Sequence, residues 1–199
     1  MCDSRIVNGS LESGKGRSGM IETCVYNSPL GRLLLAAQDG ALVGLWLEGQ
    51  KYFGGTYAAE ARQTGGQEPI LEQAQVWLDR YFAGEKPLIA TLKLSPAGSL
   101  FRQTVWSILT EIPYGELITY GDIARQAAHR LGLSSMSAQA VGGAVGHNPI
   151  SIIIPCHRVV GAKGSLTGYA GGIANKLKLL EHEGVQTSAL FVPKKSTAP

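Results

Sequence analysis

The sequence lacks the features that mark several large classes of protein. It contains only 3 cysteines in 199 residues, and three thiols cannot all pair within one chain, so a disulfide-stapled fold is not expected. No run of about 18 apolar residues occurs, which excludes a membrane-spanning helix. The net charge is only +3, a balance that permits a nucleic-acid partner without requiring one. Because Met1–Met20 is polar and lacks the apolar segment of a secretory signal, we expect a reduced, cytoplasmic protein.

Glycine, by contrast, is abundant, at 26 residues, about twice the usual ~7%. Residues 1–19 are rich in glycine, serine and charge, and we expect a disordered lead-in there. Residues 20–94 predict an α/β subdomain of short strands, with a hairpin signal at Asp39-Gly40 and a helix over Ile70–Phe82. This part carries no convincing chemistry, so its expected role is that of a scaffold.

Residues 95–186 predict a mainly α C-terminal domain, and residues 187–199 a tail. Helices are expected at Leu100–Thr110, from Thr119 to about His129, at Ala138–Gly146 and at Ile173–Glu183. The two middle helices favour a helix-turn-helix of the winged-helix-like kind, although the loop between them is longer than usual. The fold class is therefore an α/β N-terminal subdomain joined to a mainly α C-terminal domain.

The predicted helix Ala138–Gly146 consists almost entirely of small residues. Its three glycines each cost about 1 kcal/mol relative to alanine, so another factor must favour them. One interpretation is close packing against another helix, which is the default from sequence alone. The other is a helix that enters a narrow groove, such as the ~6 Å minor groove of DNA.

The apolar run Ile150–Ile154 predicts a buried strand that ends just before Cys156 and His157. A cysteine in this place is usually a small core residue, but a neighbouring imidazole is what activates a thiol as a nucleophile. Adjacent residues on a strand point to opposite faces, so a contact between the two requires a turn or a bridging water. A metal site is not indicated, because no further cysteine or histidine lies at ligand spacing.

Two further features follow the cysteine. The stretch Gly161–Gly172 holds five glycines around Tyr169, which suits either a flexible hairpin or a pocket for a flat ligand. In the last predicted helix, Lys176 lies near the start and Glu183 near the end, where the helix dipole disfavours each charge. The two residues are seven apart and share a face, which is a modest indication of function.

Taken together, these motifs resemble one family over about residues 20–186. The sequence is similar to the O6-alkylguanine-DNA alkyltransferases, and in particular to their constitutive bacterial type. The segments that carry the resemblance are Thr119-Tyr120-Gly121, Val141-Gly142-Gly143-Ala144, Asn148-Pro149-Ile150, Pro155-Cys156-His157-Arg158-Val159, Gly168-Tyr169-Ala170-Gly171-Gly172 and His182-Glu183-Gly184.

The resemblance implies irreversible, single-use transfer of the alkyl group from O6-alkylguanine in double-stranded DNA to Cys156, with O4-alkylthymine as a further candidate substrate. His157 would act as the base through a water, and Glu183 would hold its imidazole. The lesion would be rotated out of the duplex, because the alkyl carbon is unreachable inside the stack. The implied catalytic set is Cys156, His157, Glu183, Asn148 as a hinge, Tyr120 as a donor to the leaving base, and Lys176 near the leaving oxygen.

The resemblance also implies that DNA is bound through the minor groove. We expect a monomer without a cofactor. The structural zinc of some relatives is not expected here, because Cys2 and Cys24 have no obvious histidine partners. The implied DNA-binding residues are Gln139, Ala138, Ala140, Gly142, Thr119 and Tyr120, and the implied substrate pocket is Val159, Tyr169, Ala170 and Gly171. Gln139 departs from the family, which usually has an arginine there to fill the gap left by the rotated base. Ala170 stands where some members have serine, and Gly171 predicts a pocket that accepts bulky adducts and free O6-benzylguanine.

Two other classes of function remain open at this point. A non-catalytic sensor of alkylated DNA would lack the cysteine nucleophile, which this chain has at Cys156, so that hypothesis depends mainly on Gln139. A cysteine–histidine hydrolase would use the same pair of residues, but the sequence shows no device for binding an oxyanion. Turnover of an ester or a peptide would identify a hydrolase.

Overall fold

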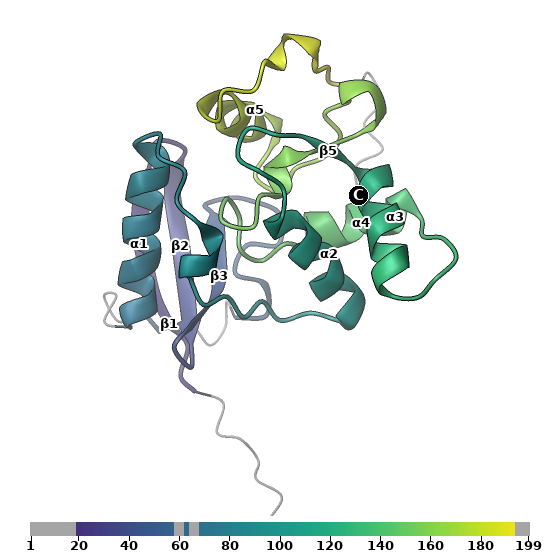
Figure 1. The fold of residues 1–199 in the computed structure, drawn as a ribbon. Coiled ribbons are helices and arrows are strands. Elements are labelled where there is room, and N and C mark those ends of the chain that lie inside the picture. The colour runs from purple at the N-terminus through teal and green to yellow at the C-terminus, as the bar shows by residue number, and fades with distance from the viewer. Residues whose placement is uncertain (1–18, 58–61, 64–67, 194–199) are drawn as a thin grey trace, which may run out of the picture.

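The computed structural model describes residues 19–57, 62–63 and 68–193, which form a sheet half and a helical half side by side (Figure 1). The sheet half confirms the predicted strands, hairpin and helix. Its elements are β1 (Glu22–Ser28), β2 (Gly31–Gln38), β3 (Ala41–Leu47), η1 (Gly55–Tyr57), β4 (Arg62–Gln63), α1 (Pro69–Phe82) and η2 (Ile89–Thr91).

The sheet has the strand order β3-β2-β1-β4, antiparallel except for the parallel pair β1 and β4. The turn between β2 and β3 places Asp39 and Gly40 at φ 52° and 69°, which is the left-handed backbone that an Asp-Gly hairpin turn requires. Helix α1 covers one face of the sheet with its apolar stripe, as Figure 1 shows. Local turn chemistry and a helical period therefore suffice to specify this half.

The helical half confirms the predicted helices to within about a residue. Its elements are α2 (Leu100–Thr110), β5 (Ile118–Thr119), α3 (Tyr120–Arg130), α4 (Ala138–Gly146), η3 (Cys156–Arg158), β6 (Val159–Val160), η4 (Ala162–Gly164), α5 (Ile173–His182) and η5 (Thr187–Ala189). Helices α2, α3 and α4 pack against one another, and β5 pairs with β6 in parallel.

Side-chain caps explain why the central helices begin where they do. Thr119 and Asp122 form a reciprocal capping box at the start of α3, and the Ser137 hydroxyl accepts a hydrogen bond from the backbone N–H of Gln139 at the start of α4. Each cap satisfies donors that the first turn of a helix leaves free. These caps agree with the helix starts expected from the sequence at Thr119 and Ala138.

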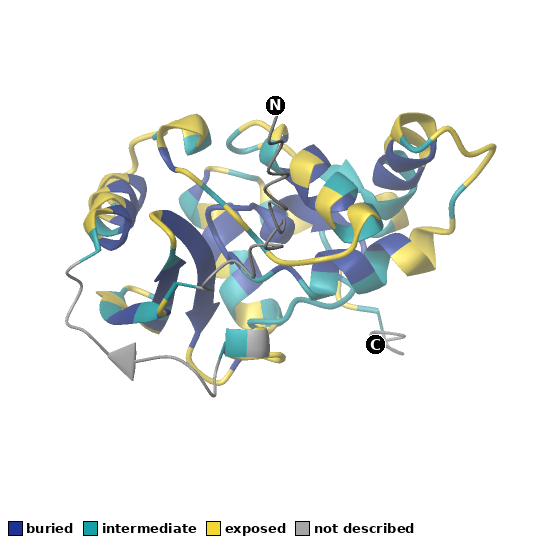
Figure 2. Ribbon diagram, turned by 90° about the horizontal axis from the view of Figure 1, so that it is seen from below, coloured by how far each residue is buried: buried dark blue, intermediate teal, exposed yellow. Residues whose placement is uncertain are grey.

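The two halves join along β3, every residue of which is buried. The backbone N–H of Leu45 donates to Pro149 O at 2.8 Å, and Ser151 N–H donates to Leu45 O at 2.8 Å. One buried apolar cluster continues across this junction from β3 and α1 to Ile150 and Val159. In Figure 2 the buried positions face this shared interior, while the loops are largely exposed. The sheet half is thus packed directly against the segment that leads to Cys156.

The prediction of a strand over Ile150–Ile154 is wrong. Only Ile150 bridges to Leu45; the chain then turns, Ile152 takes φ 69°, and Ile154 N–H donates to Ile150 O at 3.0 Å. The cause is Asn148, whose side-chain amide donates to the carbonyls of Ile150 at 3.3 Å and Ile154 at 2.8 Å. A polar side chain therefore curls an apolar run that would otherwise extend.

The predicted lead-in over residues 1–19 lies outside the described residues except for Gly19. Of the predicted tail, Thr187–Ala189 forms a 3₁₀ turn, and Phe191 bridges to Ser165. Within the described part of the chain, none of the helices is both long and apolar enough to cross a bilayer.

Candidate active site

Cys156 is the first residue of the 3₁₀ turn η3, directly after Pro155. Cys156 is only 5% exposed to solvent, and its sulfur lies 3.1 Å from the side-chain nitrogen of Asn148. Asn148 therefore donates to Sγ with the same amide that holds the preceding turn. A turn in place of a strand also removes the geometric obstacle to placing His157 beside the thiol.

His157 is fully buried and coupled to Glu183, with 2.7 Å between Nε2 and Oε1. An ionised carboxylate only accepts hydrogen bonds, so Nε2 must carry the hydrogen and Nδ1 is the basic nitrogen of the neutral ring. Among the described residues, Nδ1 of His157 is buried and without a hydrogen-bond partner. The arrangement leaves one imidazole nitrogen free to take a proton.

Glu183 accepts hydrogen bonds from four residues. Arg158 binds both carboxylate oxygens, at 2.8 and 2.9 Å, and His157 contributes the third bond. The Tyr81 hydroxyl donates to Oε1 at 2.8 Å, and Gly115 N–H donates to Oε2 at 3.1 Å. Burial alone would raise the pKa of Glu183, but the hydrogen bonds from His157 and Arg158 outweigh it and hold that pKa well below its ordinary value.

Gly115 can be only glycine without rearrangement of this carboxylate site. Its φ is +77°, and a Cβ there would lie 2.9 Å from the backbone oxygen of Glu183. Both facts exclude a side chain, because the left-handed backbone and the close approach are each costly for other residues. The turn Pro113-Tyr114-Gly115 therefore supplies a backbone donor to the site.

The resting protonation state follows from burial. Burial raises the pKa of the Cys156 thiol, although the Asn148 hydrogen bond and the Lys176 charge oppose it. Burial likewise lowers the pKa of His157, against the opposing effect of Glu183. Near neutral pH the pair therefore rests as a thiol and a neutral imidazole, which is a protonated nucleophile beside an available base.

Lys176 is a fully buried cation on the second turn of α5. Its Nζ donates to Val159 O at 2.5 Å, and burial lowers its pKa to about 8. The carbonyl oxygen of Val159, a residue of the implied substrate pocket, is thus already engaged, although it can accept a second hydrogen bond. Lys176 and Glu183, noted for their disfavoured helix positions, both face residues 156–160.

Aromatic side chains line the space next to the thiol. A Cys156 thiolate would raise the pKa of both Tyr120 and Tyr169, although burial is the larger cause in each case. The Tyr120 hydroxyl donates to Thr167 O at 3.1 Å, whereas the buried Tyr169 hydroxyl has no hydrogen-bond partner in the described part of the chain. A Cβ on Gly171 would lie 2.8 Å from the Tyr169 ring, so this glycine lets the ring pack closely.

Apart from Tyr120, the implied DNA-binding residues belong to α4 and to the N-cap of α3. Ala138, Gln139 and Ala140 are exposed at the start of α4, whereas Thr119 is engaged in the α3 cap. A Cβ added to Gly143 would meet no atom within 4 Å, and one added to Gly142 would make only ordinary contact with Tyr120. Close packing within this chain therefore does not require these glycines, and the default interpretation from sequence is wrong.

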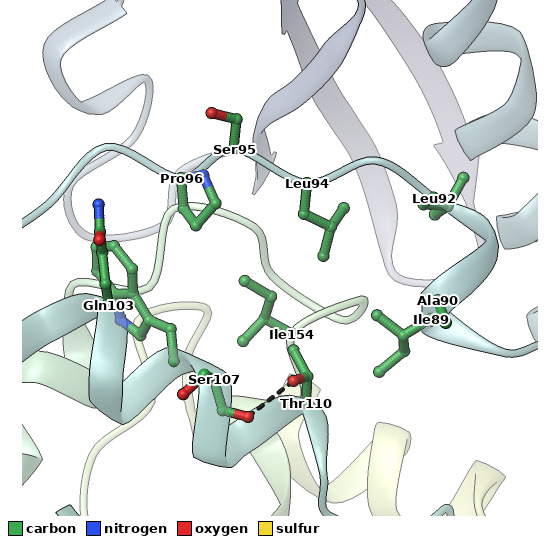
Figure 3. Close-up of a pocket in the computed structure, with 11 residues that line it drawn as sticks. Ile89, Ala90, Leu92, Leu94, Ser95, Pro96, Gln103, Ser107, Thr110 and Ile154 are labelled. Atoms are coloured by element: carbon green, nitrogen blue, oxygen red, sulfur yellow. Dashed lines mark hydrogen bonds between the residues drawn. The ribbon is translucent and has the colours of Figure 1, made fainter. Parts of the chain in front are cut away.

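A cavity of about 600 Å³ lies at the junction of the halves, between α2 and the segment that follows η2 (Figure 3). Its lining includes neither Cys156 nor any titratable side chain and consists of Ile89, Ala90, Leu92, Leu94, Ser95, Pro96, Gln103, Trp106, Ser107, Thr110 and Ile154. It is therefore not the reacting centre. In the described ranges, no group of three or more potential metal ligands gathers anywhere.

The structure brings together most of the residues singled out from sequence. Cys156, His157, Glu183, Asn148 and Lys176 form one buried constellation. Sequence reasoning missed two contributors to it, Tyr81 and Gly115. It noted Arg158 as a cation near Cys156 but did not pair it with Glu183, and nothing in the sequence links Tyr81 to a carboxylate 102 residues away.

Comparison with known protein families gives two adjacent matches. Residues 22–96 match the model of the 6-O-methylguanine DNA methyltransferase ribonuclease-like domain. Residues 100–185 match that of the 6-O-methylguanine DNA methyltransferase DNA binding domain. The matches together span most of the described chain.

Individual relatives agree with these matches. The methylated-DNA–protein-cysteine methyltransferase of Haemophilus influenzae is 38% identical over 161 residues, which are 80% of this chain and 84% of that protein. That of Mycolicibacterium paratuberculosis is 43% identical over 82% of this chain and 93% of its own length. Among solved structures, Mycobacterium tuberculosis OGT in complex with DNA is 40% identical, with a TM-score of 0.69 over 85% of this chain and 94% of that one.

Proposed function

Because this chain belongs to the 6-O-methylguanine DNA methyltransferases, which repair DNA by transferring an alkyl group to one of their own cysteines, we propose that Cys156 is the acceptor. The observation that carries the assignment is the contact of Cys156 with Asn148 beside the His157–Glu183 pair. The other described cysteine, Cys24, lies in β1 with its sulfur 3.0 Å from the Gln75 amide.

The reaction needs one proton transfer before the carbon moves. Nδ1 of His157 takes the thiol proton of Cys156 through one bridging water, and Glu183 stabilises the imidazolium that results. The Cys156 sulfur then attacks the alkyl carbon in line, so that an S–C bond forms while the C–O6 bond of guanine breaks. The product is a thioether, and because no second nucleophile restores the thiol, each molecule reacts once.

The departing guanine gains the electron pair of the broken C–O bond and needs stabilisation. Lys176 supplies a buried positive charge next to the Cys156 segment, and its pKa of about 8 leaves it mostly protonated at neutral pH. Tyr120 becomes a donor to guanine N3 when its hydroxyl leaves Thr167 O. Val159, Tyr169, Ala170 and Gly171 line the proposed pocket that holds the rotated base.

DNA is a partner of this protein, and we propose that α4 contacts it through the minor groove. Support comes from the small exposed residues Ala138 and Ala140 and from Gly142 and Gly143, which need no close packing within the chain. A narrow helix fits the ~6 Å groove better than a bulky one. We further propose that the protein acts as a monomer, and that the reduced thiol it requires places it in the cytoplasm.

The alternative of a non-catalytic sensor is not supported. The relatives that match over most of this chain are named as cysteine methyltransferases, and the chain has the cysteine and the histidine–carboxylate pair that transfer needs. A hydrolase has no support from the relatives either. Gln139 therefore bears on DNA affinity rather than on the class of function.

Intact-protein mass after incubation with a duplex carrying one O6-methylguanine tests the assignment directly. We expect a gain of one methyl group per protein molecule and none in Cys156→Ala. A matched Cys24→Ala variant should gain the methyl group as the unaltered protein does, because Cys24 lies in β1, bonded to Gln75. Methylation that persists in Cys156→Ala, or that is lost in folded Cys24→Ala, would show that Cys156 is not the acceptor.

Gln139→Arg should tighten binding to duplex DNA. Gln139 is exposed at the second position of α4, and an arginine adds a charge-assisted donor of about 1 kcal/mol, or roughly fivefold in Kd. The measurement is a salt titration of DNA affinity, in which the slope of log K should steepen by about one phosphate contact. Gln103→Arg, which adds the same charge on the exposed surface of α2, serves as the control. Equal gains in both variants would point to net charge alone.

A further inference from the structure

Tyr81 connects the sheet half to the reacting centre. It belongs to the last turn of α1, and its hydroxyl donates to Oε1 of Glu183 at 2.8 Å in a buried contact. The sequence separation is 102 residues, and the two partners lie in different halves of the molecule. The half expected to be only a scaffold thus places a hydrogen-bond donor on the carboxylate that holds His157.

The Tyr81 ring cannot easily turn away from this contact. Trp77 stacks on it at 5.5 Å between centroids, while Phe82 and Tyr114 meet it edge-on at 5.2 and 6.0 Å. The backbone carbonyl of Tyr81 lies 2.7 Å from Nε2 of His182, which anchors the end of α1 to the end of α5. Ring packing and the backbone contact therefore both hold the Tyr81 hydroxyl against Glu183. Tyr81 as a whole is only 1% exposed to solvent.

The hydrogen bonds at Oε1 of Glu183 let the Tyr81 hydroxyl influence the basicity of His157. Tyr81, His157 and Arg158 all bond this one oxygen, at 2.8, 2.7 and 2.9 Å. A carboxylate offers about four lone-pair positions in all, so three donors on one oxygen share its charge. Each added donor stabilises the carboxylate and thereby weakens its support for a proton on the imidazole.

We propose that Tyr81 is a positioning residue for alkyl transfer, whose hydroxyl sets how strongly Glu183 supports the imidazole of His157. The inference rests on the proposed role of His157 as base. The hydroxyl adds to the effect of burial and makes the imidazole a still weaker base, which is neutral at physiological pH. Without it, Glu183 would hold the imidazolium more firmly, and His157 would remain protonated to higher pH.

Other charged and titratable groups also face His157 and Glu183, and a variant that tests Tyr81 must leave these groups unchanged. Arg158 and Cys156 come from η3, Lys176 and His182 from α5, and Tyr114 and Tyr169 from the adjacent loops. Tyr114 offers a matched control, because its hydroxyl donates to the backbone oxygen of His182 at 3.2 Å instead of to Glu183. Tyr114→Phe removes a hydroxyl from the same aromatic cluster without changing the donors on the carboxylate.

The experiment measures the rate of methyl transfer from an O6-methylguanine duplex to the full chain between about pH 5 and pH 9. In Tyr81→Phe, the ascending limb that reports His157 should move to higher pH by about half a unit to one unit. In Tyr114→Phe it should coincide with that of the unaltered protein. Incorporation of 3-fluorotyrosine at position 81 keeps the ring and makes the hydroxyl a stronger donor, so the limb should move to lower pH.

Three results would overturn the inference. A Tyr81→Phe profile that coincides with the unaltered one, or that is scaled down equally at every pH, leaves Tyr81 with a structural role only. If Tyr81→Phe does not fold, the fluorotyrosine protein decides, and a limb that stays in place contradicts the proposal. Absence of methyl transfer by the unaltered protein would instead defeat the proposed function itself, which separates the two failures.

Discussion

Replacing His157 with glutamine should slow alkyl transfer by about 100- to 10,000-fold at neutral pH, which is the usual contribution of a general base. Glutamine can still donate an amide hydrogen to Glu183, but it cannot accept the Cys156 proton. Because burial raises the pKa of the Cys156 thiol, the variant must wait for spontaneous ionisation. The measurement is the rate of methyl incorporation under single-turnover conditions.

The pH dependence of that variant provides a second check. Its rate should climb with pH toward that of the unaltered protein, because alkali replaces the missing base in forming the thiolate. His129→Gln is the matched control, since His129 is exposed at the end of α3 and should change the rate less than about twofold. A His157→Gln protein that reacts normally at neutral pH would show that another group ionises Cys156.

Arg158→Met should lower the free energy of unfolding by about 3–5 kcal/mol, the range observed when one partner of a buried ion pair is removed. Arg158 binds both oxygens of Glu183 and also donates to Ile112 O at 2.6 Å. Methionine fills much of the volume but leaves a buried carboxylate without its cation. Denaturant unfolding followed by circular dichroism measures the change.

The loss should depend on pH in a definite direction. The folded-state pKa of Glu183 lies below its unfolded value, so its contribution is complete above the ordinary carboxylate range and is lost as pH falls. The difference in the free energy of unfolding between the unaltered protein and Arg158→Met should therefore become smaller below about pH 4. Arg32→Met breaks an exposed pair with Glu48 and should cost less than about 1 kcal/mol. Equal losses in the two variants would contradict the buried-pair account.

Elements with strong local signals were predictable from sequence with good accuracy. Helix α4 begins at Ala138 because Ser137 caps it, and α3 begins at Tyr120 because Thr119 and Asp122 cap each other. The hairpin at Asp39-Gly40 likewise follows from two residues that tolerate left-handed backbone. Such signals act between residues close in the chain, so a single sequence displays them.

The segment Ile150–Ile154 shows where this reasoning fails. Its β-branched composition favours a strand, but the hydrogen bonds of Asn148 to Ile150 O and Ile154 O close a turn instead. The same turn lets Cys156 begin a 3₁₀ helix with His157 beside it. The competition between an extended run and side-chain hydrogen bonds depends on geometry that composition does not contain.

The sequence by itself determined the division into a sheet half and a helical half, most helix boundaries, and the candidate nucleophile and base, Cys156 and His157. It also marked Lys176 and Glu183 as charges at the wrong ends of a helix. These conclusions need only local periodicity, caps and the chemistry of neighbouring side chains. Only the tertiary structure decided what surrounds Glu183, because Tyr81, Gly115 and Arg158 reach it from three separate segments. Donors that come from separate segments and meet only in the folded chain leave no periodic or adjacent trace in a sequence.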